Sequence, residues 1–426
     1  MSPIEDHPLR YALANELHAR PFPSLDAPCG AIFLAIKRPE QPEAHEVDAG
    51  RAHLTQLLDR YGAPHPQPGA THWFGEVGKF KLKWEQHTEF VTYTLFTPAL
   101  EDRPFDPKAF QGFPDEWLAS APGPRITSAL IRVEGDPGPA EITKRVDGWF
   151  VPESLAVSKV LDGAATIATD FRIDVAGHMR LAIFVGDVTG ERRIGRIVQR
   201  LCEIETYKSM SMLGLARVRD RGPRKRDLDT TLTALMSAMT EGGTNAEDTL
   251  RELLVTSAEL ESLLAQSSFR FGATGAYEAI VNQRIDVLRE QRFEGRQTFA
   301  EFMMRRFDPA MRTVKASERR LQTMAERAIR AGDLLRTRVD VERSAQNQKL
   351  LESMDKRADL QLRLQKTVEG LSVVAISYYA VNLVLYMAQP AAYAVGIPKL
   401  LLAAVTTPVV VLAVWWMVHR IREKME

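Results

Sequence analysis

Four uncharged polar residues interrupt an apolar stretch near the carboxyl end of the chain. They are Ser372, Tyr379, Asn382 and Tyr386. Their spacing of 7, 3 and 4 residues places them on one face of a helix. Polar groups inside a bilayer turn toward another helix or toward water. Three interpretations stay open: a hydrogen-bonded contact between helices, the lining of a pore formed by several copies, or a packing face without a special role.

Three further groups of polar residues have a suggestive spacing. The stretch NELHARPF (15–22) gathers Asn, Glu, His and Arg, which predicts either a polar site or a hydrogen-bonded helix end. His72 and His87 flank a predicted hairpin, where they could bind a metal together or remain unpaired. Glu205 and Lys208 lie on one helical face, which predicts an ion pair.

The sequence contains none of the short motifs that mark the common catalytic and cofactor sites. It has no Gly-Lys-Ser/Thr phosphate loop, no His-Glu-x-x-His, no Gly-x-Ser-x-Gly and no dinucleotide Gly-x-Gly-x-x-G. Cys29 and Cys202 are far apart, so we expect two free thiols packed as small apolar side chains. We therefore expect no catalytic residue, no metal, no cofactor and no enzymatic activity.

Length and charge limit the remaining classes. A chain of 426 residues suggests two or three structural units. Lys+Arg and Asp+Glu are both 55, so no net field favours a nucleic-acid partner. The first 25 residues have acidic groups and no apolar core of signal-peptide length, which predicts that the N-terminal part stays in the cytosol.

Residues 1–220 are predicted to form a mixed α/β domain. Helical spacing favours a helix over 43–61, and a short helix over 106–120 is expected to break at Pro114. Residues 71–82 and 88–96 alternate like strands and should be joined near 83–87. Further strands are predicted at 31–38, 126–135, 154–161, 164–174 and 178–186.

Beyond Thr189 the pattern is helical. A helix over 191–220 should break at Gly222-Pro223, where a basic linker is expected. Helical segments then fill 228–307, with joints predicted at 242–243, 272–275 and Gly295. We place a domain boundary at 220 and expect a helical stalk over 221–366.

Asp308-Pro309 is predicted to open a helix of roughly 80 residues, since Asp caps helices and Pro suits a first turn. A heptad seam indicates packing either on the preceding helices or on other copies of the chain. Its residues are Val314, Leu321, Ala328 and Leu335, with Met324 and Ala331 between them.

The last region, 367–426, is predicted to be a transmembrane hairpin. The apolar runs 371–388 and 401–419 are each long enough to cross a bilayer core of about 30 Å. Trp415 and Trp416 are typical interface anchors. The outer flanks are more basic than the short loop, which places both termini in the cytoplasm by the positive-inside rule. The flanking residues are Arg363, Lys366, Arg420, Arg422 and Lys424, against Lys399 in the loop.

Several long stretches resemble a bacterial family of membrane-anchored proteins of unknown function. They are NELHARP, RFGATGAYEAIVNQRIDVLRE, LLRTRVDVE and QNQKLLESMDKRADLQLRLQKTVEGLSVVAISYY. The resemblance covers nearly the whole chain and implies an inner-membrane location. The family brings no assigned activity and no catalytic residues.

The expected topology also resembles the CorA-type divalent-cation channels, homopentamers whose first span lines the pore. Their Gly-Met-Asn triplet would fall at the outer end of that span, where this chain reads Tyr386-Met387-Ala388-Gln389-Pro390. Only the topology is shared. The favoured hypothesis is a membrane-anchored homo-oligomer whose cytosolic domain senses or docks. The alternative is a divergent CorA-like cation channel, with divalent cations as the transported partner.

Overall fold

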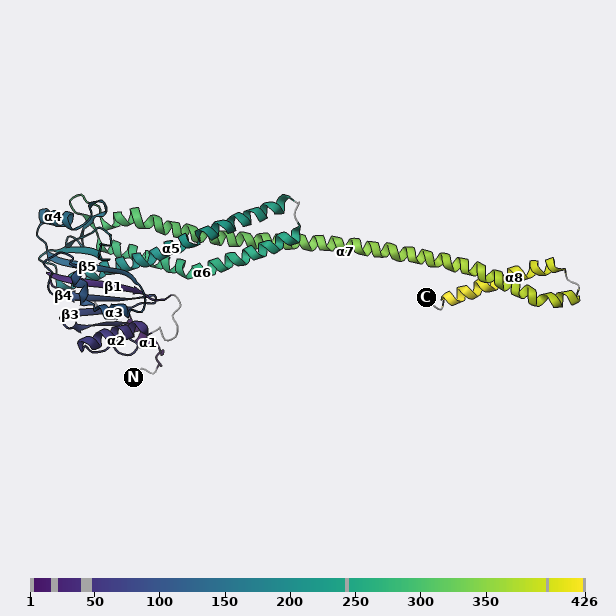
Figure 1. The fold of residues 1–426 in the computed structure, drawn as a ribbon, viewed down its shortest axis with the longest axis horizontal. Coiled ribbons are helices and arrows are strands. Elements are labelled where there is room, and N and C mark those ends of the chain that lie inside the picture. Colours follow the sequence, from purple (N-terminus) through teal and green to yellow (C-terminus); the bar gives the residue numbers. More distant parts are fainter. Residues whose placement is uncertain (1–3, 17–21, 40–47, 242–244, 396–397, 424–426) are drawn as a thin grey trace. The chain divides into compact units, whose positions relative to one another are not determined.

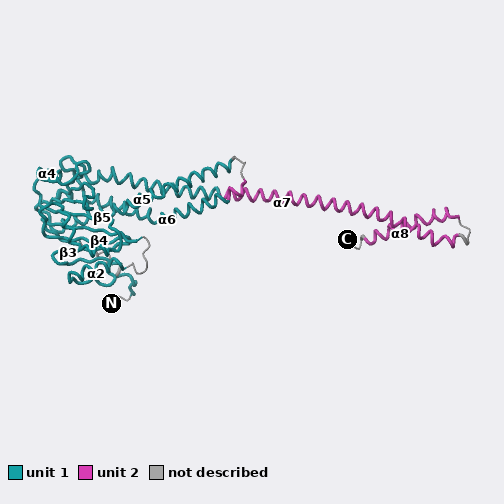
Figure 2. The backbone as a smooth tube through the Cα atoms, in the orientation of Figure 1, with its two compact units in different colours: residues 1–243, 251–331 teal, residues 244–250, 332–426 magenta. Residues whose placement is uncertain are grey.

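The computed structural model describes residues 4–16, 22–39, 48–241, 245–395 and 398–423. The chain divides into two units (Figure 2). Unit 1 comprises residues 1–243 and 251–331, and unit 2 comprises residues 244–250 and 332–426.

Unit 1 is built on a nine-stranded sheet with the strand order β2-β3-β4-β1-β5-β8-β7-β6-β9. Neighbouring strands are antiparallel except β5 and β8, which are parallel. The strands are β1 Cys29–Lys37, β2 His72–Val77, β3 Phe80–Gln86, β4 Phe90–Thr97, β5 Arg125–Gly135, β6 Ala156–Val160, β7 Ala165–Thr169, β8 Met179–Val185 and β9 Gln291–Arg292.

Strand β1 is central and all nine of its residues are buried. This explains its unbroken apolar sequence, because both faces of the sheet are covered there. Its odd-numbered residues face one core, as Phe33 does, and its even-numbered residues face the other, as Leu34 does.

Short helices cover one face of the sheet. Leu54 and Leu57 of α2 (Ala49–Tyr61) pack there, together with Trp117 of α3 (Asp115–Ala119). Ile142 and Val146 of α4 (Pro139–Trp149) pack over β6, β7 and β8. The remaining short elements are α1 Arg10–Glu16 and the 3-10 helices η2 Pro107–Gly112 and η3 Pro152–Ser154.

Long helices cover the other face. They are α5 (Glu191–Glu241), α6 (Ala246–Leu288) and the first part of α7 (Phe299–Val395). Figure 1 shows them running away from the sheet together. Ion pairs join α5 to both partners, Arg224 to Glu259 on α6 and Arg320 to Asp229 from α7. The mixed α/β fold followed by long helices was therefore predicted correctly.

Two predicted breaks are absent. Helix α5 continues through Gly222-Pro223. Pro223 is exposed, so water can satisfy the carbonyl group that the proline leaves unpaired. The glycines at 272–275 lie inside α6, where Thr274 packs so close to Gly214 of α5 that a β-carbon on Gly214 would clash with it.

Helix α7 begins at Phe299, so the predicted start at Asp308-Pro309 was wrong. Thr298 and Glu301 form a reciprocal capping box: the backbone N–H of Glu301 donates to Thr298 Oγ1 at 3.2 Å, and that of Thr298 donates to Glu301 Oε2 at 3.1 Å. The predicted joint at Gly295 is confirmed, since its φ is +73°.

One strand prediction was also wrong. Residues 71–82 are not one strand but parts of β2 and β3, because Gly78 adopts a φ of +59° and makes a turn between them. The next hairpin, β3 to β4, turns at 87–89, at the end of the predicted joint. The N-terminal half of the helix predicted over 43–61 lies mostly outside the described residues.

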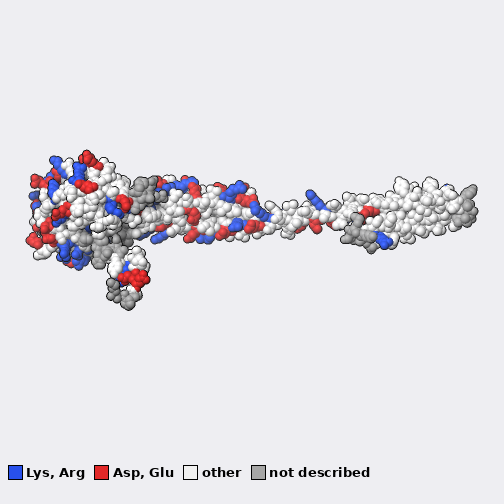
Figure 3. Space-filling model, turned by 90° about the horizontal axis from the view of Figure 1, so that it is seen from below, with Lys and Arg blue, Asp and Glu red and all other residues white. Residues whose placement is uncertain are grey.

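Unit 2 consists of the first residues of α6, the remainder of α7, and α8 (Lys399–Glu423). Helix α8 runs back alongside the last part of α7 (Figure 1). On the face shown in Figure 3, the far part of this unit is almost free of charged side chains.

Candidate functional site

The four residues of the predicted polar stripe all lie on α7 within unit 2. Tyr379 and Tyr386 are 72% and 74% exposed. The Ser372 hydroxyl donates to the Val368 carbonyl at 2.8 Å, and Asn382 Nδ2 donates to the Tyr378 carbonyl at 3.0 Å. The two polar donors are thus satisfied within their own helix. The Asn382 side-chain oxygen can still accept a hydrogen bond from a neighbour.

The buried polar residue in this part of α7 is Ser377, which does not belong to the predicted stripe. Ser377 is 5% exposed, and in the apolar segments Ala392 of α7 and Val414 of α8 are also buried. Small side chains allow two apolar helices to approach closely. Ser377 was not predicted as a site residue, because the larger polar residues of the stripe lie on a different face of the helix.

The apolar segments of α7 and α8 satisfy the length and composition of a membrane span. Their best 18-residue windows have mean hydropathies of 1.7 and 2.2, and only 6% of each window is buried. The core helix of a soluble protein can have the same length and composition. Such a core helix is mostly buried, whereas these segments are not.

Over residues 340–368, helix α7 does not pack closely enough on any other described part of the chain to bury its side chains. Val314, Leu321 and Ala328 are buried, so the first heptads pack within the chain. Every residue over 340–368 is exposed. The large apolar side chains in this segment are Val341, Leu350, Leu351, Met354, Leu360, Leu362, Leu364 and Val368.

In unit 1 the most deeply buried ion pair joins the β3–β4 turn to α6. Glu89 and Arg270 are 5% and 2% exposed, and the guanidinium binds both carboxylate oxygens, at 2.6 and 3.0 Å. The Tyr277 hydroxyl donates to Glu89 at 3.0 Å. Burial and the charge of Glu89 raise the pKa of Tyr277. The stretch RFGATGAY thus docks α6 on the sheet through its first and last residues.

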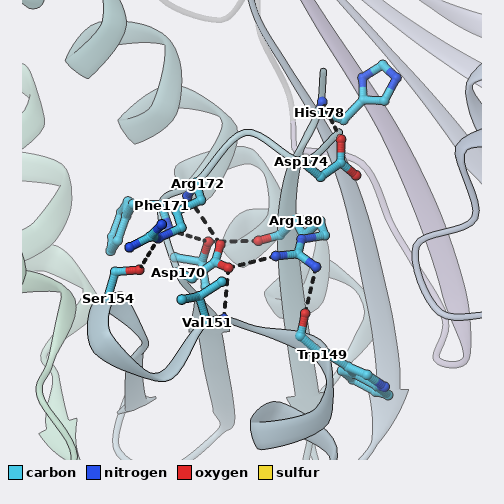
Figure 4. A network of polar contacts seen from close by, with 10 residues as sticks. Trp149, Val151, Ser154, Asp170, Phe171, Arg172, Asp174, His178 and Arg180 are labelled. Carbon is cyan, nitrogen blue, oxygen red and sulfur yellow. Dashed lines mark hydrogen bonds and ion pairs between the residues drawn. The ribbon is translucent and has the colours of Figure 1, made fainter. Parts of the chain in front are cut away.

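A second buried carboxylate holds the connections around β7 and β8 (Figure 4). Asp170 is fully buried and binds Arg180 Nη2 at 2.7 Å. It also accepts the backbone N–H groups of Val151 and Arg172, at 3.1 and 3.2 Å. Arg180 donates in turn to the Trp149 carbonyl at 2.7 Å. All of these hydrogen-bonding partners are groups of the chain itself, so we interpret the network as one that stabilises the fold.

The nearby residues Ser128, His178 and Asp174 resemble a catalytic triad in type only. Ser128 Oγ lies 2.9 Å from His178 Nδ1. Asp174, however, accepts the backbone N–H of His178, at 2.9 Å, and the imidazole points away from that carboxylate (Figure 4). A triad needs the carboxylate on the imidazole. Burial and the charge of Arg125 lower the pKa of His178, whose ring is tilted against that of Phe110 with the ring centroids 4.1 Å apart.

The other predicted groups have mixed outcomes. Glu205 and Lys208 form the predicted ion pair at 2.6 Å. Cys29 and Cys202 are free and buried, as predicted, and burial raises the pKa of Cys29 to about 12. Most of NELHARPF lies outside the described residues.

The two hairpin histidines, His72 and His87, lie in β2 and directly after β3. His72 lies opposite Glu85 in the sheet register, whereas the His87 ring stacks on Phe90 at 4.4 Å. Over the described ranges of the chain, no three His, Cys, Asp or Glu side chains are grouped so that they could hold a metal ion.

These features define a class of protein: a mixed α/β domain on a nine-stranded sheet, followed by long helices of which two segments are apolar and uncovered. The family model described as "Protein of unknown function (DUF3422)" matches residues 5–425, so the chain belongs to this family. A search of the curated proteins finds no match. The predicted membership in a family of unknown function, over nearly the whole chain, is confirmed.

Proposed function

We propose that this protein is anchored in the bacterial inner membrane by the last part of α7 and by α8, and that it self-associates there. Unit 1 then acts in the cytoplasm as a sensing or docking domain, with both termini on that side. The activity is not enzymatic in this proposal.

The observation that carries the proposal is the exposure of the apolar segments. Side chains such as Leu371, Val374 and Leu412 are more than 60% exposed. Monomeric soluble proteins rarely expose contiguous apolar patches of more than a few hundred Å². Lipid removes this surface from water without any further protein partner, and a span of about 20 residues matches the bilayer.

The exposed segment 340–368 supports self-association. An isolated helix this polar gains little stability in water, so it needs a partner. Within this segment and the start of the apolar run, apolar residues recur at alternating spacings of three and four, as in a coiled coil. They are Leu350, Met354, Leu364, Val368 and Leu371, with Arg357 and Gln361 at the two intervening positions. Asn382 falls on the same seam, where a buried amide fixes register between copies.

Fractionation and crosslinking test the proposal. We expect the full-length chain to stay in the membrane pellet after alkaline carbonate washing. Proteases added outside spheroplasts should leave unit 1 intact. Crosslinking in native membranes should give discrete homo-oligomers. A chain that appears in the supernatant without detergent contradicts the anchor, and a strictly monomeric chain contradicts the self-association.

The second candidate function is a divergent CorA-like cation channel. The favouring observation is that the stripe residues Tyr379 and Tyr386 face away from the buried position of Ser377, so α8 does not cover them. In an assembly they can face an axis. Proteoliposomes should then take up Mg²⁺ or Co²⁺, and Asn382→Ala should change the flux. Absence of flux, with reconstituted protein of the right orientation, removes this candidate and leaves Asn382 as an interhelical contact.

A further inference from the structure

Unit 1 contains a partly open cavity with a mixed polar and apolar lining between its sheet and α5. The cavity has a volume of about 230 Å³. Strands β3 and β4 form its floor, Val198 to Tyr207 of α5 form one wall, and Arg284 of α6 closes a corner. This volume is below the range of drug-sized ligand pockets, about 300–1,000 Å³, so it suits a small metabolite.

The floor of the cavity breaks the pattern of the rest of that sheet face. Where α5 covers β1, β5 and β8, most inward residues are apolar, as Phe33 and Ile131 are. On β3 and β4 the inward residues are instead Lys83, Glu85, Thr92 and Thr94. Lys83 is only 5% exposed. Burying charged groups costs stability even when they are paired, so this floor has no advantage over an apolar one for folding alone.

Charges of opposite sign alternate around the lining of the cavity, from the floor to the helices. Lys83 Nζ lies 3.2 Å from Glu85 and donates to Gln199 Oε1 at 2.6 Å. Gln199 Nε2 donates to Glu203 at 2.9 Å, and Arg284 pairs with the second oxygen of Glu203. The lining therefore holds two cationic and two anionic side chains. Their charges cancel, so the cavity does not select a net anion or a net cation.

Two hydroxyls in the floor have unused hydrogen-bonding capacity. Among the described residues, no partner bonds the side chain of Thr92 or Thr94, although they are only 6% and 7% exposed. A floor that served only to hold the ion pairs would not need them. They are available for a polar group inside the cavity.

Much of the remaining lining is aromatic. Phe33, Phe90 and Phe96 lie beside the threonines, and Tyr207 stands at 5.8 Å from Phe90. An apolar or aromatic side chain can bury itself there while charged groups of the same molecule reach Lys83 and Glu203. Pockets of this kind combine apolar walls with a few polar groups that fix orientation.

We propose that this cavity binds a small zwitterion, a free α-amino acid with an apolar side chain. Lys83 and the two threonine hydroxyls receive its carboxylate. Glu85 and Glu203 receive its ammonium group, and the phenylalanines enclose its side chain. This proposal names a class of ligand for the sensing role of unit 1. Its biological meaning rests on that proposed role, whereas the binding itself does not.

The test uses the full chain purified in detergent, so membrane topology and oligomeric state do not affect it. Each of the twenty free L-amino acids is screened for a rise in the unfolding midpoint and then titrated by calorimetry. For L-phenylalanine, 3-phenylpropionate carries only the carboxylate and 2-phenylethylamine only the ammonium. We expect at least one apolar amino acid to bind, and its singly charged analogues to bind at least tenfold more weakly.

Variants connect the binding to this cavity. Lys83→Met and the double substitution Thr92→Val, Thr94→Val should each weaken binding tenfold or more. The threonine variant keeps side-chain shape, so it decides the matter if Lys83→Met fails to fold. Lys108→Met, in a separate cavity near Gly112, is the matched control and should bind as the wild type does. The proposal is overturned if no amino acid binds, if the analogues bind equally well, or if the threonine variant binds normally.

Discussion

The two units of this molecule differ in how far their charged and apolar side chains are buried. In unit 1 the most deeply buried ion pair joins Glu89 to Arg270, and the apolar side chains of the sheet are covered on both faces. In unit 2 the charged pairs are on the surface, as Arg363 and Asp359 are, and the leucines are exposed beside them. One helix, α7, contributes to both environments.

The difference teaches where the stability of each part comes from. Unit 1 buries its own core, so its fold depends on interactions within the chain. Unit 2 has helical backbone but little buried surface, so most of its stabilisation has to come from outside the single chain. Perturbations of internal contacts should therefore act strongly in unit 1, and perturbations of outward-facing residues should act on assembly in unit 2.

The largest expected effect is the loss of the buried ion pair in unit 1. Arg270→Ala leaves the Glu89 carboxylate buried without its main partner, which destabilises unit 1 by about 3–5 kcal/mol. The measurement is the shift of the unfolding transition followed by the fluorescence of the tryptophans in the sheet domain.

The matched control is Arg343→Ala in unit 2, where the pair with Glu247 is 66% and 50% exposed on its two sides. Exposed pairs contribute about 0–1 kcal/mol, so this variant should be close to the wild type. Equal effects of the two substitutions would show that the contrast between the units does not hold for charges.

The second effect concerns assembly. Leu364 lies on the predicted seam between copies, and Leu362 lies off it; both are exposed, at 65% and 56%. Leu364→Ser should lower the crosslinked oligomer at least tenfold, because burial of a leucine contributes about 2 kcal/mol per copy. Leu362→Ser should leave crosslinking unchanged. The seam is wrong if both variants, or neither, lose the oligomer.

Much of unit 1 could be predicted from local patterns, because its strands carry unbroken apolar or alternating runs. The continuous apolar run of β1 is an example. Some errors arose where glycine and proline were taken as breaks, and one arose where the turn at Gly78 was missed. Helices α5 and α6 continue through Pro223 and the glycines at 272–275, and contacts beside these positions, Arg224 with Glu259 and Gly214 with Thr274, join the two helices. The true start of α7 did have a local signal, the Thr298-x-x-Glu301 capping box.

The candidate sites were harder to predict, because their residues come from distant segments. Lys83 and Gln199 are 116 residues apart in sequence, and Glu89 and Arg270 are 181 apart. Periodicity reports which face a residue occupies but not which element covers that face. For the same reason the polar stripe could be predicted on α7, whereas the burial of Ser377 could not.

A third prediction uses pH to sharpen the contrast. His53 is buried in unit 1, where Nε2 donates to the Trp117 carbonyl and the Tyr93 hydroxyl donates to Nδ1, both at 2.9 Å. Burial lowers its pKa below 6.5. The unfolded chain therefore binds more protons below pH 6.5, and the stability of unit 1 should fall as the pH drops from there, by up to about 1.4 kcal/mol per pH unit per histidine.

His178 has a lowered pKa too, so His53→Gln should reduce this slope by about half rather than abolish it. The control repeats the measurement with His65→Gln, at an exposed position paired with Asp59, which leaves both buried histidines in place. Unfolding midpoints between pH 5 and 7.5 measure the slope. An unchanged slope in the His53 variant would mean that another group causes the acid sensitivity.

The smallest expected effect tests which contacts stabilise the different parts of helix α7. Thr298→Ala removes the side-chain acceptor at the helix start, which should cost about 1 kcal/mol. Because the capped end packs in the core of unit 1 through Phe299 and Met303, we expect faster hydrogen exchange at the first turn and a slightly lower unfolding midpoint. Exchange over 340–368 should be unaffected, since that segment depends on contacts outside the chain. If exchange rises equally along the whole helix, α7 is ordered from its start, and the division between self-supported and externally supported regions is wrong.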